Sequence, residues 1–226
     1  MRPDLGEKTP PRRLPRGGEF RRRLATAFGR DTVAGDAFWR RILHGAGAFV
    51  LVYLVMPTDL FVVAPKEVVL LLALAAVGVL ELLRLRAGVE LPTIRSYEAG
   101  RPASYVFYAV ALVVAVLLFP APIAVAVVLG TAIVDPIAGA LRGSVRKRRL
   151  GPWLPFAVYT ALAATALAVV GRWPWGWAGA LGALAGAIAV AVERWRFRWL
   201  DDDLTMTVVP ALVLYVVGVV VLGLAG

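Results

Sequence analysis

Long apolar stretches separated by short polar segments dominate the chain from residue 38 onward. A membrane-crossing helix needs about 20 predominantly apolar residues, and the pattern predicts seven such helices. We expect them at Phe38–Met56, Val68–Leu83, Tyr105–Phe119, Ile123–Leu141, Leu154–Val170, Trp177–Val192 and Met206–Leu224. The pattern therefore predicts an all-α membrane protein with about seven transmembrane helices.

The N-terminal segment has a different pattern. Residues 1–18 are rich in Pro, Arg and Gly and show no apolar repeat, which is typical of disordered chain. Residues 19–28 place apolar side chains at helical spacing opposite a run of arginines. This is typical of a basic amphipathic helix on an anionic membrane surface, and a solvated charge run fits equally well. The chain thus divides into a basic tail, 1–37, and a polytopic helical membrane domain, 38–226.

Composition supports the membrane assignment and narrows the partners. The chain is 60% hydrophobic with a mean hydropathy of +0.75, whereas soluble domains are about 45–50% apolar. The net charge of +10 could indicate nucleic-acid binding, but the basic residues lie in the tail and in alternate loops, where anionic lipid explains them. We expect membrane lipids as partners and no nucleic acid. The chain has no cysteine, so disulfides and thiolate metal sites are excluded.

Arg and Lys in the short loops predict the orientation, because cytoplasmic loops are enriched in them. One side of the predicted bundle receives the N-terminal tail, Arg84, Arg86, Arg95, Arg101, Arg142–Arg149, Arg194, Arg196 and Arg198. The other side receives only Lys66 and Arg172. We therefore expect a multi-pass protein of the plasma membrane with a cytoplasmic N-terminus and a C-terminus outside.

Acidic residues gather on the same predicted cytoplasmic side. Asp135 ends a long apolar run, and a carboxylate is costly in hydrocarbon, so it is a functional candidate by default. Carboxylates hold Mg²⁺ together with water and phosphate oxygens, Arg and Lys neutralise phosphoryl oxygens, and an acid near a hydroxyl can act as base. Catalytic candidates are Asp135, Glu81 and Glu98; metal candidates are Asp135, Asp202 and Asp203. Nucleotide and phosphate candidates are Arg40, Arg41, His44, Arg84, Arg95, Arg142 and Lys147.

Several of these residues also have a purely structural interpretation. Glu81 and Arg84 are spaced as an i,i+3 ion pair, which can simply anchor a helix end. His44, the one histidine, can be an interfacial hydrogen-bonding residue. Arg142–Arg149 can be the basic flank that ends many membrane helices. The three consecutive aspartates at residues 201–203 are the least ordinary feature, and they favour a metal site.

Taken in order, short motifs in the chain resemble the CTP-dependent polyprenol/dolichol kinase and phytol kinase family of membrane lipid kinases. They are Arg40-Arg41-Ile-Leu-His44, Glu81-Leu-Leu-Arg84, Arg95-Ser-Tyr-Glu98, Asp135-x-x-Ala138 with its basic tail, and Asp202-Asp203-Leu204-Thr205. The resemblance implies cytosolic CTP as donor, a divalent metal such as Mg²⁺, and a lipid alcohol as acceptor. It also implies that Asp135 and Asp202 serve metal and triphosphate, and that Arg41 and Lys147 contact phosphate.

The chain departs from that family in one region, and other functions stay open. After the basic loop it reads Gly151-Pro-Trp-Leu-Pro-Phe-Ala-Val-Tyr-Thr, without the family's Lys-Ser-x-Glu-Gly stretch. A CTP:lipid-phosphate cytidylyltransferase that makes a CDP-lipid is one alternative. A non-enzymatic transporter or scaffold is another, although a transporter would place charges near mid-bilayer rather than at one edge. Homo-oligomer formation is left open.

Overall fold

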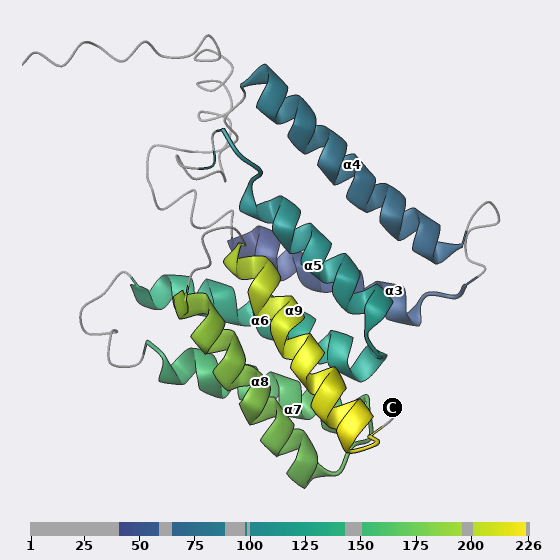
Figure 1. Ribbon diagram of the computed structural model, residues 1–226, viewed down its shortest axis with the longest axis vertical. Coiled ribbons are helices and arrows are strands. Elements are labelled where there is room, and N and C mark those ends of the chain that lie inside the picture. Colours follow the sequence, from purple (N-terminus) through teal and green to yellow (C-terminus); the bar gives the residue numbers. More distant parts are fainter. Residues whose placement is uncertain are drawn as a thin grey trace, which may run out of the picture.

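The computed structural model describes residues 41–58, 65–88, 98, 100–142, 151–195 and 201–224, and every regular element in them is a helix (Figure 1). The first helical segment, residues 41–55, includes η1 (Ala48–Leu51) and α3 (Val52–Val55). It is followed by α4 (Lys66–Ala87), α5 (Ser104–Leu118), α6 (Ala121–Arg142), α7 (Trp153–Val169), α8 (Trp175–Trp195) and α9 (Asp202–Val213), which the π-helical η4 (Leu214–Val221) continues. The prediction of an all-α chain is confirmed for these residues.

Four of the described helices are long and apolar enough to cross a membrane. They cover Lys66–Ala87, Ala121–Gly139, Trp175–Trp195 and Asp202–Val221. Three shorter apolar helices, Arg41–Val55, Ser104–Leu118 and Trp153–Val169, complete the set. Each of these segments overlaps one predicted stretch, in the same order. The architecture therefore fits a membrane protein.

Proline and aspartate residues determine where several helices begin. The carbonyls of Pro65, Pro120, Pro152 and Pro174 each accept the N–H four residues ahead, so a helix starts directly after each proline. Proline is tolerated there because the missing N–H has no helical partner at a helix start. Asp201 caps α9 through its side chain, which accepts the N–H of Asp203 at 3.1 Å. The prolines therefore fix the starts of α4, α6, α7 and α8, and Asp201 fixes the start of α9, the helix that carries Asp202 and Asp203.

The close packing of α7 on α8 depends on glycine. A Cβ on Gly182 would lie 2.8 Å from the backbone nitrogen of Ala164, and one on Gly186 would lie 2.7 Å from Thr160 Oγ1. Only glycine allows this approach, which is the small-residue packing typical of membrane helices. Of the described helices, α7 and α8 are the most closely packed pair.

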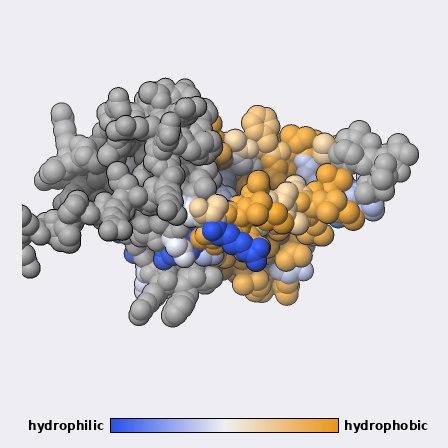
Figure 2. Space-filling view, turned by 90° about the horizontal axis from the view of Figure 1, so that it is seen from above, coloured by the Kyte–Doolittle hydropathy of each residue, from blue (hydrophilic) through white to orange (hydrophobic). Residues whose placement is uncertain are grey.

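Burial is uneven between α6 and α4. In the most apolar stretch of each helix, 67% of the residues are buried in α6, whereas 11% are buried in α4. The helix α4 packs mainly on α5 and lies at one side of the bundle (Figure 1). Its only buried residues are Glu81 and Arg84, and its leucines are largely exposed. Figure 2 shows hydrophobic residues covering much of the described surface on one face. Such a surface suits contact with lipid chains rather than water.

Candidate functional site

Three polar side chains from separate helical segments meet inside the bundle. His44 Nε2, in the first segment, lies 3.1 Å from Asp203 Oδ1 at the start of α9 and 3.6 Å from Asp135 Oδ2 in α6. One ligand atom from each residue lies within 4.8 Å of the others. The exposed fractions of His44, Asp135 and Asp203 are 3%, 8% and 0%. We call this group the His44–Asp135–Asp203 cluster.

The register between α6 and α9 brings the two aspartates together. The hydroxyl of Thr207 is hydrogen-bonded to the hydroxyl of Thr131 at 3.0 Å and to the carbonyl of Asp203 at 3.0 Å. Thr131 lies one turn before Asp135, and Thr207 lies one turn after Asp203, so the two helices run antiparallel. Both threonines are fully buried. The threonine contact therefore marks the register in which Asp135 and Asp203 lie close together.

The orientation of His44 is fixed by Tyr108 of α5. The hydroxyl of Tyr108 donates to the His44 carbonyl at 2.8 Å. The two rings stack with centroids 4.6 Å apart and an interplanar angle of 20°. Gly47 makes room for this arrangement, because a Cβ there would collide with the Tyr108 hydroxyl. The imidazole is thus held from its face, with Nε2 directed at the two aspartates.

A second acidic group adjoins the cluster at the start of α9. Asp201, Asp202 and Asp203 each place a carboxylate oxygen within 4.8 Å of the others. Burial raises the pKa of Asp201 to about 7, with further contributions from the charges of Asp203 and Asp202. Crowded carboxylates raise one another's pKa, and a nearby cation reverses that effect. Asp203 belongs to both groups.

The predicted metal set of Asp135, Asp202 and Asp203 is therefore arranged around Asp203. Asp135 and Asp203 share one group, and Asp202 and Asp203 share the other. His44, predicted as a phosphate ligand, joins the aspartates, and this association was not predicted from the sequence. The one signal for it in the sequence was that the chain's single histidine lies near the start of the first predicted helix, close to Arg40 and Arg41.

Glu81 and Arg84 form a separate structure, which we call the clamp. Arg84 donates to Glu81 through Nε at 2.7 Å and through one terminal nitrogen at 2.8 Å. The Glu81 carboxylate also accepts the N–H of Ala103 at 2.8 Å and the hydroxyl of Tyr105 at 2.5 Å. Arg84 further donates to the carbonyl of Arg101 at 2.8 Å. The clamp thus joins the end of α4 to the start of α5, as an anchoring ion pair would.

Both oxygens of Glu81 are occupied by donors, which supports its structural interpretation over a role as catalytic base. Tyr105, which donates to Glu81, and Tyr108, which stacks on His44, lie one turn apart on α5. The clamp therefore helps to place the helix that orients His44.

The remaining predicted site residues are distributed around these two structures. Glu98 is buried, and its carbonyl accepts a hydrogen bond from Arg84 at 3.3 Å. Arg41 is exposed, three residues before His44. Arg40, Arg95 and Lys147 lie outside the described residues, and so does the side chain of Arg142. Their roles stay predictions.

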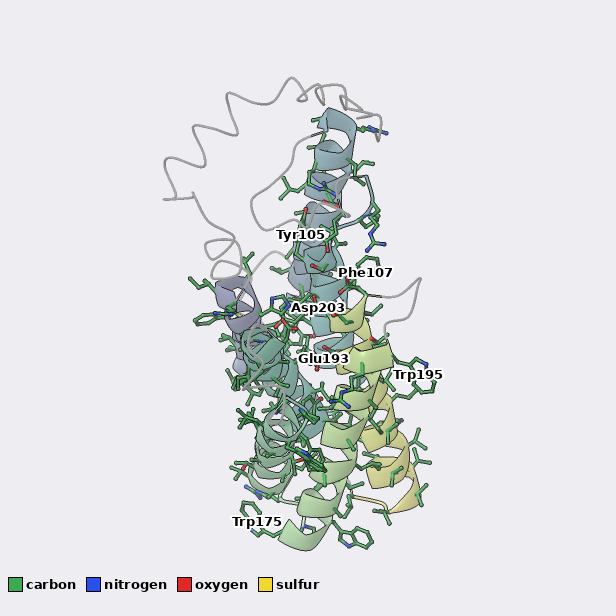
Figure 3. All side chains as sticks on the ribbon, turned by 90° about the vertical axis from the view of Figure 1, so that its left-hand side faces the viewer. Tyr105, Phe107, Trp175, Glu193, Trp195 and Asp203 are labelled. Carbon is green, nitrogen blue, oxygen red and sulfur yellow. The ribbon has the colours of Figure 1, made fainter. Side chains whose placement is uncertain are left out.

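Figure 3 shows where Asp203 lies relative to the ends of α8. Glu193 and Trp195 lie at one end of this helix and Trp175 at the other, and Asp203 lies toward the Glu193 end. Trp175 and Trp195 are 66% and 76% exposed. A helix of 21 residues spans about 30 Å at 1.5 Å per residue, which matches the hydrocarbon thickness of a bilayer. Exposed tryptophans at both ends are typical of membrane–water interfaces.

The side chains of the cluster are suited to binding a cation. Two carboxylates and an imidazole can bind a divalent ion, and an ionised carboxylate can accept a proton. No protein family, curated protein or solved structure matches the chain.

Proposed function

We propose that the chain is a membrane enzyme that transfers a phosphoryl group from CTP, or another nucleoside triphosphate, to a lipid alcohol at the cytoplasmic face. The acceptor belongs to the polyprenol, phytol or diacylglycerol type, and Mg²⁺ or a similar divalent ion assists. The observation that carries the proposal is the convergence of His44, Asp135 and Asp203 from three helical segments into one buried group. An ionisable cluster of this kind inside a membrane bundle is typical of a functional site.

The proposed topology has seven crossings with the N-terminus in the cytoplasm. In such a chain, the start of the first segment, the ends of α4, α6 and α8, and the start of α9 share one side. His44, Glu81, Asp135, Glu193 and Asp203 lie at those five places, which supports this arrangement. The shorter helices are accommodated because a bilayer thins locally around a short apolar segment. The site then opens at the inner leaflet, where a lipid hydroxyl and a cytosolic nucleotide can meet.

In the proposed reaction, the lipid hydroxyl oxygen attacks the terminal phosphorus, the bond to the bridging oxygen breaks, and the nucleoside diphosphate leaves. Asp135 and Asp203 would hold the divalent ion, which when bound withdraws charge from the phosphate oxygens. The proton of the hydroxyl goes to a carboxylate oxygen of Asp135 or Asp203 that does not bind the ion. Exposed Arg41 lies on the same segment as His44 and contributes positive charge for the triphosphate.

The test uses the full chain in phospholipid nanodiscs with Mg²⁺ and terminally labelled CTP or ATP, offered to polyprenol, phytol and diacylglycerol in turn. We expect label in the lipid extract with the parent chain and a loss of at least about 100-fold with Asp135→Asn. Glu67 lies at the start of α4, at the opposite end from Glu81, and its exposed carboxylate accepts a hydrogen bond from Tyr53. Glu67→Gln is therefore the matched control. It should retain full activity.

Two outcomes overturn the proposal. One is the absence of label in any lipid with either donor. The other is seen when a lipid phosphate is offered in the same assay: formation of a CDP-lipid with release of labelled pyrophosphate, and no label in the lipid alcohols, would identify a cytidylyltransferase instead.

A further inference from the structure

We infer that His44, Asp135 and Asp203 form a cation site of one imidazole nitrogen and two carboxylate oxygens, and that this site prefers Mn²⁺ to Mg²⁺. The inference rests on the proposed function for the use of the ion, whereas binding of the ion is measured without turnover. It assigns His44 to the ion rather than to phosphate.

The separations within the cluster suit a shared ion. Two ligands about 2.1 Å from one ion and at right angles to each other lie about 3 Å apart. The separations of 3.1 Å between His44 Nε2 and Asp203 Oδ1, and of 3.6 Å between His44 Nε2 and Asp135 Oδ2, are close to that value. The three ligand atoms need only small side-chain adjustments to surround an ion.

The imidazole is positioned independently of the aspartates. Tyr108 stacks on its ring and donates to its backbone carbonyl, and Gly47 provides the space for Tyr108. The aspartates are positioned by the packing of α9 on α6, in the register marked by the hydrogen bond between Thr131 and Thr207. Two separate supports therefore direct a nitrogen and two carboxylates at one point, which is how preorganised metal sites are built.

The ligand set selects the ion. Mg²⁺ prefers oxygen ligands and keeps several waters, so an imidazole is a poor ligand for it. Mn²⁺ binds the same carboxylate and water oxygens as Mg²⁺, and as a transition-metal ion it also binds an imidazole nitrogen, which Mg²⁺ binds weakly. A neutral imidazole and two carboxylates thus suit Mn²⁺ while leaving positions for oxygens of a substrate.

A protonated His44 bonded to both aspartates without an ion would give similar distances, so the experiment must detect coordination itself. The chain contains a single histidine and no cysteine. A nitrogen coordinated to a bound ion therefore identifies His44 directly, provided that the chain carries no histidine tag and no nucleotide is present.

The experiment titrates Mn²⁺ into the chelator-stripped full chain in nanodiscs. Electron paramagnetic resonance measures free and bound Mn²⁺, and the modulation of the electron spin echo detects a coordinated ¹⁴N nucleus. We expect one tightly bound Mn²⁺ per chain with ¹⁴N coupling. The affinity for Mg²⁺, measured by its displacement of bound Mn²⁺, should be at least about tenfold lower than the affinity for Mn²⁺. His44→Gln should abolish the coupling and weaken Mn²⁺ binding by at least about tenfold, while Glu67→Gln should bind as the parent does.

Absence of ¹⁴N coupling in the Mn²⁺-loaded parent chain overturns the inference, whatever the variants do. Equal affinity of the parent chain for Mn²⁺ and Mg²⁺ overturns the preference. Failure of the proposed function gives a different result: ¹⁴N coupling is present, but no label reaches any lipid. Conversely, phosphorylation of lipid with Mg²⁺ by a chain that shows no ¹⁴N coupling retains the function and removes this site.

Discussion

The clamp and the His44–Asp135–Asp203 cluster both contain a carboxylate near the end of an apolar helix, yet their surroundings differ. Glu81 finds its charged partner three residues away, and donors from the start of α5 fill its remaining positions. Asp203 meets a histidine 159 positions away in the chain. A carboxylate saturated by local donors is an anchor, whereas carboxylates gathered from distant segments indicate a site for something else to bind.

The largest expected effect is on stability, at the clamp. Arg84→Ala leaves Glu81 buried without its cation, and breaking a buried ion pair costs about 3–5 kcal/mol. We expect a marked fall in the unfolding temperature, which is measured in nanodiscs by the fluorescence of the tryptophans. The double variant Glu81→Gln with Arg84→Met should recover much of this loss, because an apolar or neutral replacement leaves no unpaired charge. An unchanged unfolding temperature in Arg84→Ala would show that the clamp anchors nothing.

The next effect is on cation affinity, at the cluster. Asp203→Asn removes a carboxylate ligand and should weaken divalent-ion binding by about 100-fold, which is about 2.7 kcal/mol. Its unfolding temperature without metal should be equal to or above that of the parent, because a buried charge has been removed. Isothermal titration and thermal unfolding of the same sample measure both. A variant that loses stability and keeps ion affinity would reverse the roles of clamp and cluster.

A third prediction concerns the space beside His44. Gly47→Ala forces Tyr108 away from the histidine ring and should destabilise the chain by about 1–3 kcal/mol, as overpacking usually does. Ion affinity should fall as well, because the imidazole loses its support. Gly45→Ala is the matched control, since a Cβ there meets nothing within 4 Å. Equal behaviour of the two alanine variants would contradict the role of Tyr108.

The smallest effect is expected at the threonine contact. Thr207→Val keeps the shape of the side chain and removes its hydroxyl, which should cost about 0.5–1.5 kcal/mol. Ion affinity should change less than in Gly47→Ala, because the backbone of α9 keeps its packing. Thermal unfolding and ion titration against the parent chain measure these differences. A loss of ion affinity as large as that of Asp203→Asn would mean that the threonines themselves belong to the site.

The helices could be predicted from the sequence because their signals are local. Each helix is an apolar run, and a proline directly precedes α4, α6, α7 and α8, so these signals can be read without knowledge of the packing. The pairing of Glu81 with Arg84 was predictable for the same reason, since three-residue spacing places them on one helix face. The number of helices that cross the membrane and the orientation of the termini stay predictions.

The composition of the cluster depends on long-range packing, so the sequence predicted it only in part. Which of the three consecutive aspartates faces inward depends on the face of α9 that packs inside the bundle, against α5, α6 and α8. Asp203, Thr207, Ala211 and Leu214 share that buried face at helical spacing, a signal that would have favoured Asp203 over Asp202. The approach of His44 to both aspartates depends on α5 and had no comparable signal.

The register of α9 on α6, marked by the hydrogen bond between Thr131 and Thr207, has a geometric consequence for the cluster. A slip of α9 past α6 by one helical turn would displace Asp203 from Asp135 by about 5.4 Å. Every helix would stay folded, and the apolar surfaces would still find apolar neighbours, yet the two carboxylates could no longer reach a common ion. The stability of this bundle and its ability to bind an ion are therefore separable properties. The second depends on the alignment of α6 and α9 along their axes.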